Sequence, residues 1–297
     1  MRRQEEIEMA REHADKTTYY TVRHPEEFKI DWRAFYDRAD ELTEEARRNL
    51  PHALNLAYGS NPKQKVDLYL PKSTSRRCPV FVFLHGGRFR EGDRAHYGYV
   101  ATPLAGHNVI SVIASYRLTP DYHYPDQVED VEQLLSWIVR DIKGYGGDPG
   151  IIYMGGHSAG AVLSALVSLR TGWRKRLSLP PDLIRGFAAI GAPSFDLRKG
   201  NWVDEYLPDP NQRSEASPLL NIEAVPPRAV VATSFFKDKA GGQEAVTASE
   251  EMVQKMREKG SLVELVLLED MDHSKMVLSL GDEQSKLAKA ILNMITL

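Results

Sequence analysis

The sequence has 297 residues, of which 42% are hydrophobic and 27% charged, with a formal net charge of −3. This length suits one large α/β domain, or a domain with a modest cap. The nearly neutral charge argues against a nucleic-acid partner, and no apolar run is long enough to span a membrane. The charged start, Met1 to Glu6, lacks the apolar core of a secretory signal. The single cysteine, Cys78, excludes an internal disulfide and favours a reducing compartment, so we expect a cytoplasmic protein.

The first 55 residues are rich in charge and are predicted to form an N-terminal helical arm. Glu41 to Arg48 is the clearest helix, because its acidic and basic side chains fall at i,i+4 spacing. No catalytic motif occurs in this stretch. We expect the arm either to cover the mouth of an active site or to pack against a main domain formed by residues 56–297.

From Val66 onward, strand and helix patterns alternate along the chain. The expected strands are residues 66–70, 80–84, 109–113, 151–154, 187–190, 229–233 and 262–268, and the expected helices are 128–142, 161–167, 244–259 and 283–295. Short apolar runs of the strand type, separated by amphipathic helices, are typical of a mostly parallel sheet with helices on both faces. The fold class is therefore predicted to be α/β.

One stretch of the main domain, from about residue 194 to 227, interrupts this alternation. It contains five prolines, together with Trp202, Tyr206 and Leu207 among polar residues. Long inserts between regular elements are often functional. We expect a small lid here, and a surface excursion without a catalytic role is the alternative.

The most informative motif is Gly156-His157-Ser158-Ala159-Gly160, a G-x-S-x-G pentapeptide. It follows a predicted strand and precedes a predicted helix, which is the setting of a nucleophile elbow. In such a turn the serine hydroxyl is presented at the edge of the sheet, and the helix N-terminus favours developing negative charge. Ser158 is therefore the predicted nucleophile.

A serine nucleophile needs a general base, and the base needs an acid that orients it. Of the nine histidines only His273 comes after the serine motif, and it follows the last predicted strand. Asp238 follows the strand before it, which gives the chain order serine, acid, histidine. Glu244 is the alternative acid. Asp270 and Asp272 lie too close to His273 along the chain to take that position.

The third catalytic element is His85-Gly86-Gly87, directly after the strand of residues 80–84. Glycines allow backbone amides to approach a substrate closely, and amides fixed at an oxyanion typically contribute about 2.7–4 kcal/mol each. We assign the oxyanion hole to the amides of Gly86 or Gly87 and of Ala159. The sequence lacks motifs for a catalytic metal, a nucleotide or a dinucleotide, so no cofactor is expected.

These motifs resemble the α/β-hydrolase fold family, in its esterase/lipase group of hormone-sensitive-lipase-like, feruloyl-esterase-like and bacterial kynurenine-formamidase-like proteins. The matching pieces begin near Tyr58 and include Asp67-Leu68-Tyr69-Leu70-Pro71, His85-Gly86-Gly87, residues 116–120, residues 145–149 and the serine motif. The resemblance implies that Arg117 and Asp130 belong to the scaffold. The chain departs from the formamidase-like pattern at Arg88, where an aromatic residue is usual, and before Asp238, where a glycine is common.

We therefore expect a cofactor-free serine hydrolase that cleaves carboxylic esters of small to medium acyl or aryl substrates. An arylformamidase or amidase is the alternative, and a non-catalytic ligand-binding scaffold is a remote third. Residues placed on or near the loops that would line a substrate pocket are Phe89, Tyr97, Trp202, Tyr206, Phe235 and Met276. The expected partner is a small molecule, and the sequence leaves open whether copies of the chain associate.

Overall fold

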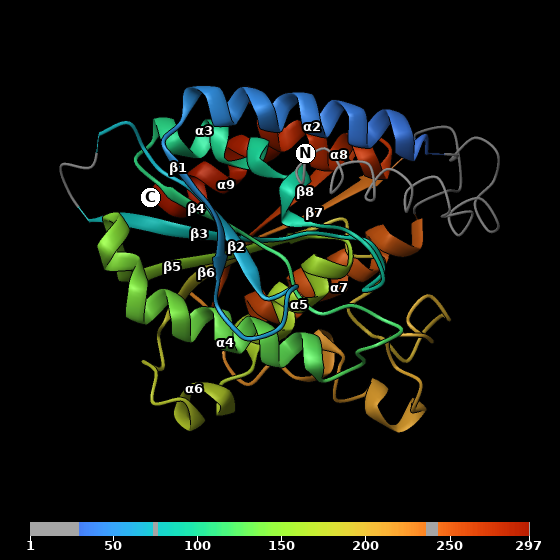
Figure 1. Ribbon diagram of the computed structural model, residues 1–297. Helices are drawn as coiled ribbons and strands as arrows, with labels where there is room; N and C mark the ends of the chain where they lie inside the picture. Colours follow the sequence, from blue (N-terminus) through green and yellow to red (C-terminus); the bar gives the residue numbers. More distant parts are fainter. Residues whose placement is uncertain (1–29, 74–76, 236–242, 297) are drawn as a thin grey trace.

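The computed structural model describes residues 30–73, 77–235 and 243–296, and its centre is an eight-stranded sheet (Figure 1). The strands run in the spatial order β1-β2-β4-β3-β5-β6-β7-β8. Their bounds are β1 His52–Ala57, β2 Lys65–Tyr69, β3 Cys78–Leu84, β4 Ile110–Ala114, β5 Gly147–His157, β6 Ile184–Ile190, β7 Arg228–Phe235 and β8 Leu262–Glu269. β2 pairs antiparallel with β1 and β4, and all other pairs are parallel.

Helices cover both faces of this sheet (Figure 1). On one face lie α2 Trp32–Asn49, α3 Ala101–Gly106, α8 His273–Leu278 and α9 Lys286–Thr296. On the other lie α4 Asp126–Asp141, α5 Ala159–Leu169 and α7 Gln243–Glu258, with the short α6 Gly172–Arg176 at the periphery. Each face has its own apolar core. The predicted mixed α/β architecture is thus confirmed.

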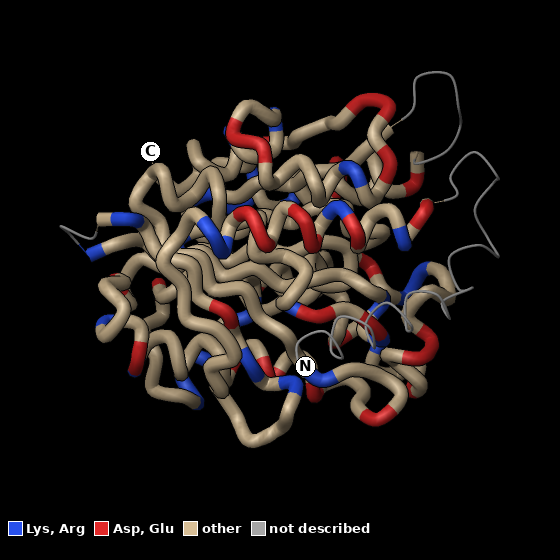
Figure 2. The backbone as a smooth tube through the Cα atoms, turned by 45° about the horizontal axis from the view of Figure 1, so that its top comes forward, with Lys and Arg blue, Asp and Glu red and all other residues tan. Residues whose placement is uncertain are grey.

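The burial of the strands explains why they form this sheet. All five residues of β4 are buried. In β3 and β5 the residues toward the carboxyl end of the strand are buried. Strands enclosed on both faces favour continuous apolar runs over alternation. Lys, Arg, Asp and Glu lie mainly on the outer helices and loops, whereas the central strands carry few of them (Figure 2).

The N-terminal region differs from its prediction in two ways. α2 spans Trp32–Asn49, longer than the expected residues 41–48, and is capped by Asp31, whose side chain accepts from the Ala34 amide. The second difference is β1, a half-exposed edge strand with a register shift between Ala53 and Leu56, which was not predicted. α2 packs against the main domain, and residues 1–29 lie outside the described residues. A covering role for the arm stays a prediction.

The predicted lid, residues 194–227, consists of turns with two short 3-10 helices, Pro210–Arg213 and Pro218–Leu220. The Leu219 amide bonds the Phe195 carbonyl across the base of the insert, and the Glu223 amide bonds the Leu169 carbonyl at the end of α5. A third bond joins the Tyr124 amide to the Tyr206 carbonyl. The insert is therefore fastened to the main domain at several points.

The loop before α4 is organised by one buried carboxylate. Asp130 accepts from the Arg117 amide and from its Nε atom, both at 2.7 Å, and from Gln64 Nε2 at 2.7 Å. Asp130 is fully buried. These contacts give Arg117 and Asp130 structural partners, in keeping with the scaffold role that the resemblance implies for them.

Candidate active site

A tight turn joins β5 to α5 at Ser158. Its φ and ψ are 56° and −116°, and its amide donates to the Ile190 carbonyl at 2.8 Å. A non-glycine residue in such a conformation costs about 1–3 kcal/mol, so it persists only where the surroundings enforce it. Ser158 is 5% exposed and stands at the carboxyl end of the central strand. The strand-turn-helix that the motif predicts is present.

Two glycines make this turn possible because other backbone atoms occupy the space of a side chain. A Cβ on Gly156 would lie 2.2 Å from the Gly160 oxygen. A Cβ on Gly160 would lie 2.1 Å from the Leu84 oxygen, at the end of β3. The nucleophile turn, residues 155–160, is therefore packed backbone to backbone against itself and against β3.

The His85-Gly86-Gly87 segment lies beside the serine because β3 and β5 are neighbours in the sheet. A Cβ on Gly86 would lie 3.0 Å from Ser158 Cβ. Gly87 has a φ of 115°, and a Cβ there would lie 2.1 Å from the Glu91 oxygen. Ala159 is the first residue of α5, where an amide has no acceptor within its own helix. Of the predicted oxyanion-hole residues, Gly86 and Ala159 thus lie next to Ser158, and Gly87 directly follows Gly86.

His85 supports this loop from below. Its ring stacks on Tyr116 with centroids 4.5 Å apart, and its Nδ1 lies 2.7 Å from the Gly86 oxygen. Because a carbonyl only accepts, Nδ1 carries the proton and donates. Complete burial lowers the pKa of His85 to about 4, so the ring is neutral at pH 7. His85 therefore has the surroundings of a structural side chain.

His273 opens the short helix α8, whereas the sequence placed it on a loop. The Asp272 carboxylate caps this helix by accepting from the Ser274 and Lys275 amides. A Cβ on Gly191 would lie 3.2 Å from His273 Nδ1, and Gly191 directly follows Ile190, the residue whose carbonyl binds the Ser158 amide. The predicted nucleophile and base therefore both lie at the carboxyl end of β6.

The predicted acid, Asp238, lies outside the described residues. β7 ends at Phe235, which pairs in parallel with Glu269 at the end of β8, so these two strands end side by side. Glu244, the alternative, is exposed in the first turn of α7. The Asp272 carboxylate is engaged in its cap, which lowers its pKa against the opposing effect of burial.

Three of the predicted pocket residues form a stack that joins residues 85–97, which we call the oxyanion loop, to the insert of residues 194–227. The Phe89 ring lies on Tyr206 with centroids 3.7 Å apart, and on Trp202 with centroids 6.3 Å apart. Phe89 and Tyr206 are 0% and 1% exposed, and Trp202 is partly buried. Two of the three rings therefore present no free surface, and they join the insert to the loop.

The other three predicted pocket residues lie apart from this stack. Tyr97 is buried against Phe83 and Phe35 in the core beneath α2, which gives no support to a role in substrate binding. Met276 is buried, and a Cβ on Gly191 would lie 3.2 Å from its sulfur. Phe235 is half-buried at the end of β7. Met276 is thus the one that lies beside His273.

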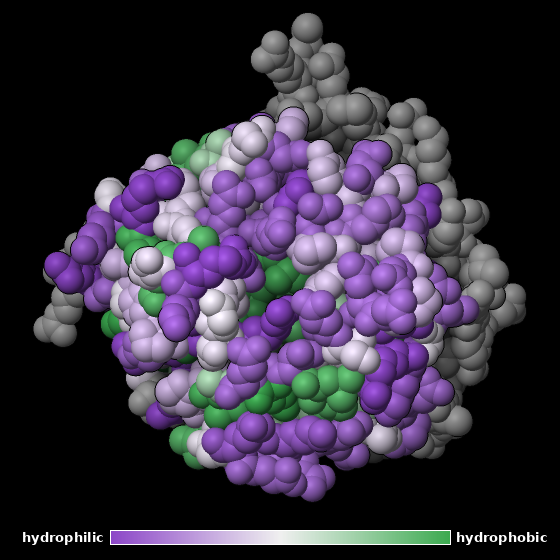
Figure 3. Space-filling model, turned by 90° about the horizontal axis from the view of Figure 1, so that it is seen from below, coloured by the Kyte–Doolittle hydropathy of each residue, from purple (hydrophilic) through white to green (hydrophobic). Residues whose placement is uncertain are grey.

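Figure 3 shows the face of the molecule seen from below, where hydrophobic surface is exposed between largely hydrophilic surroundings.

No group of three or more potential ligands (His, Cys, Asp or Glu) is placed to hold a metal ion within residues 30–73, 77–235 and 243–296. In the same ranges no helix has the length and apolarity of a membrane span.

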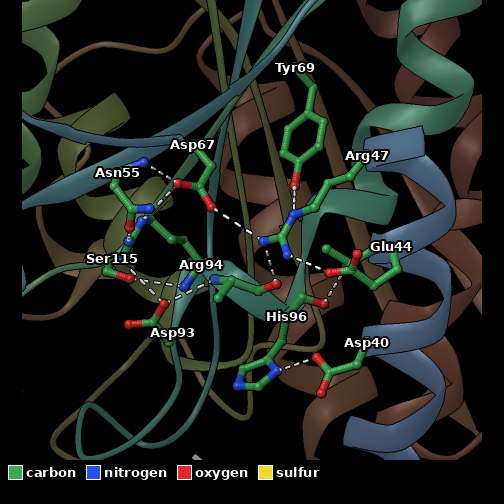
Figure 4. Close-up of polar contacts among 12 residues, drawn as sticks. Asp40, Glu44, Arg47, Asn55, Asp67, Tyr69, Asp93, Arg94, His96 and Ser115 are labelled. Atoms are coloured by element: carbon green, nitrogen blue, oxygen red, sulfur yellow. Dashed lines mark hydrogen bonds and ion pairs between the residues drawn. The ribbon is translucent and has the colours of Figure 1, made fainter. Parts of the chain in front are cut away.

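Sequence reasoning missed two sets of residues around the site. The first is His157, whose imidazole contacts His273. The second, which we call the polar clamp, joins α2 and β2 to the chain that follows the oxyanion glycines (Figure 4). It comprises Asp40, Glu44, Arg47, Asn55, Asp67, Tyr69, Asp93, Arg94, His96 and Ser115. Position inside the G-x-S-x-G motif is a signal for His157, whereas contacts between distant polar residues leave no local pattern.

Within the polar clamp, Asp67 is the central acceptor. It accepts from Arg94 Nε at 3.1 Å and from the Asn55 amide at 2.8 Å, and Arg47 Nη2 lies 3.8 Å away. Arg47 also donates to the Ala95 carbonyl, and His96 Nδ1 lies 2.6 Å from Asp40. The loop behind the oxyanion glycines is thus held by charged groups from two elements.

The sequence of this chain is similar to a family model and to several characterised enzymes. The BD-FAE family model matches residues 66–180, a range that contains Gly86, Gly87 and Ser158. The kynurenine formamidase of Salmo salar is 30% identical over 61% of this chain and 58% of its own length, and that of Danio rerio is 26% identical over 85% of each. The isoprenylcysteine alpha-carbonyl methylesterase of Arabidopsis thaliana is 36% identical over 39% of this chain and 27% of its own length.

The chain therefore spans only part of two of these relatives, 58% and 27% of their lengths. Among solved structures, the hyperthermophilic esterase of Pyrobaculum calidifontis superposes with a TM-score of 0.70 over 97% of this chain and 96% of its own, at 20% identity. At this sequence identity the superposition shows that the two proteins share a fold. Together with the sheet order, this superposition shows that the chain has the α/β-hydrolase fold, and the family match and the relatives show that its sequence is similar to the esterase/lipase group.

Proposed function

We propose that the protein is a serine hydrolase that cleaves carboxylic esters through an acyl-enzyme intermediate. The observation that carries the proposal is the strained Ser158, which has Gly86 packed against its Cβ and the His273 imidazole beside the adjoining Gly191. The similarity to an esterase of the same fold and to a plant methylesterase supports ester chemistry.

In the proposed reaction, Ser158 Oγ attacks the ester carbonyl while His273 takes its proton. The amides of Gly86 or Gly87 and of Ala159 stabilise the oxyanion of the tetrahedral intermediate. The alcohol leaves with the proton held by His273, and the acyl group remains on Ser158. Water, activated by the same imidazole, then releases the carboxylic acid and restores the serine. Asp238 is the proposed acid that orients His273.

A formamide is the second candidate substrate. It is favoured by the formamidase relatives, one of which aligns over 85% of both chains. The same residues would cleave an aryl formamide, with His273 giving its proton to the leaving amine. Arg88 reaches across the loop to the Trp202 carbonyl at 3.3 Å, which makes this corner of the site different from one with an aromatic residue.

Hydrolysis assays with three p-nitrophenyl esters, the acetate, butyrate and octanoate, test the proposal. The wild type is compared with Ser158→Ala and His273→Ala, and each variant is expected to lose about a thousandfold or more in kcat. The ratio of kcat/KM for the best ester to that for N-formylkynurenine then decides between the two substrate classes. Full activity in Ser158→Ala would refute the proposed nucleophile.

A further inference from the structure

His157 stands directly before the proposed nucleophile and contacts the proposed base. It is 3% exposed, its Nε2 lies 3.1 Å from the His273 carbonyl oxygen, and the two imidazole centroids are 4.2 Å apart. The carbonyl can only accept, so Nε2 carries the proton and donates it. This bond ties the backbone of the base to the turn of the nucleophile.

The opposite edge of the same ring faces the oxyanion loop. A Cβ on Gly86 would lie 3.0 Å from His157 Nδ1. This nitrogen is buried and, among the described residues, has no hydrogen-bond partner. One imidazole therefore lies between three elements of the site: the nucleophile turn, the oxyanion loop and the start of α8.

The surroundings of His157 also fix its charge. With Nε2 donating, a second proton on Nδ1 would be a buried donor without an acceptor, which is costly. Burial, and the nearness of His273, hold the pKa of His157 well below its usual value. The ring thus remains neutral and adds no positive charge beside His273 when that residue takes up the serine proton.

We propose that His157 is a positioning residue that holds His273 at the correct distance from Ser158. The geometry points to the Nε2 hydrogen bond as the means, with the ring contact as a secondary support. This inference rests on the proposed serine-hydrolase function, because it assigns His157 a role only through His273. It predicts that loss of the donor at the Nε2 position slows the chemical step while substrate binding persists.

The test compares three variants that differ in where they place a donor. His157→Gln can present an amide N–H near the position of Nε2, whereas the shorter His157→Asn cannot reach the His273 carbonyl. His157→Phe keeps an aromatic ring and removes the donor. Because small displacements of catalytic groups can cost about 100-fold, we expect kcat to fall about 100-fold in the Asn and Phe variants, with KM changed less than about threefold. The Gln variant should retain kcat within about tenfold of the wild type.

Thermal melts of all three variants check folding, and the Gln and Asn pair keeps the test valid if the Phe variant does not fold. Inactivation by phenylmethanesulfonyl fluoride gives a second readout that requires no substrate binding, and its rate should follow the order of kcat. Wild-type kcat in the Asn variant would overturn the inference, as would equal losses in Gln and Asn or a loss in KM alone. The variants Ser158→Ala and His273→Ala distinguish a failure of the proposed serine-hydrolase function from a failure of the positioning role of His157. If they stay active, the proposed function fails, and if only they lose activity, this inference alone fails.

Discussion

Two loops meet at the candidate site, and they are held in place by different means. The nucleophile turn, residues 155–160, is fixed by backbone packing, since a Cβ on Gly156 or Gly160 would lie within 2.2 Å of a carbonyl oxygen. The oxyanion loop, residues 85–97, also contains left-handed residues, with a φ of 54° at Arg88 and 64° at Phe89. Like the nucleophile turn it has a close backbone contact, since a Cβ on Gly87 would lie 2.1 Å from the Glu91 oxygen, but it is fastened to the rest of the molecule by side chains, through the polar clamp, the Phe89 stack and the His85 ring.

Because of this difference, we expect the two loops to respond differently to amino-acid substitution. Backbone packing leaves no room to adjust, so a single methyl group is expected to disrupt the nucleophile turn. Contacts spread over many side chains can be lost one at a time, so the oxyanion loop should weaken in steps that follow the burial of each contact. The following substitutions examine this contrast, in order of expected effect.

The largest effect is expected for Gly160→Ala. The new Cβ would meet the Leu84 oxygen at 2.1 Å, so the turn and β3 must move apart. We expect a loss of about 3 kcal/mol or more in the free energy of unfolding, at the upper end of overpacking effects, with activity reduced at least about 100-fold. Urea denaturation and ester hydrolysis measure both. Gly144→Ala is the matched control because nothing lies within 4 Å of a Cβ there. An unaffected Gly160→Ala would remove the distinction between the two loops.

The next effect is expected in the polar clamp, for Asp67→Asn. The substitution removes the charge that faces Arg94, and both side chains are less than a tenth exposed. Breaking a buried ion pair on one side costs about 3–5 kcal/mol, and we expect the lower part of this range because the amide retains an acceptor for the Asn55 amide. Urea denaturation gives the value, and kcat should fall because the loop behind Gly86 and Gly87 loses its anchor. A drop in stability without any change in kcat would show that the clamp does not govern the oxyanion loop.

A smaller effect on the free energy of unfolding is expected when the pH is lowered, because His85 is buried and neutral in the folded protein. Its pKa is about 4 in the folded protein and about 6.5 when unfolded, so below pH 6.5 the unfolded chain binds the proton more readily. Stability should therefore decrease as the pH falls from 6.5 toward 4. His85 alone should account for about 2 kcal/mol between pH 7 and pH 5. Urea denaturation at both pH values should show a correspondingly smaller decrease for His85→Gln. An equal decrease in both proteins would contradict the buried, neutral state of the ring.

The smallest effect is expected for Glu205→Gln, which removes the ion pair with Arg90 between the insert and the oxyanion loop. The two side chains are 34% and 40% exposed and their charged atoms are 2.9 Å apart. A pair this accessible to solvent contributes less than about 1 kcal/mol. Thermal denaturation at low and high salt checks the value. A loss as large as that of Asp67→Asn would mean that burial does not rank the contacts of this loop.

The sequence predicted those parts of the structure that leave a local pattern. The strands of the central sheet were evident because β3 and β4 are continuous apolar runs, and the turn at Ser158 was evident from its flanking glycines. β1 was missed because the strand is half-exposed and its alternation is broken at Asn55, which has a φ of 61°. α8 was missed because six residues are too few to show helical periodicity.

Contacts between distant parts of the chain could not be predicted. Asp67 and Arg94 are 27 positions apart, and nothing in their neighbouring residues indicates that they pair. The contact between His157 and His273 spans 116 positions and depends on the order of the strands. Asp238 lies outside the described residues, so its role stays a prediction.

The most direct measurement is the mass spectrum of the protein after reaction with a fluorophosphonate, which forms a stable adduct with an activated serine. The account predicts a single adduct on the peptide that contains Ser158, and none in Ser158→Ala or, at the same reaction time, in His273→Ala. An adduct on a different residue, or equal labelling of Ser158→Ala, would contradict the assignment of Ser158 as the nucleophile.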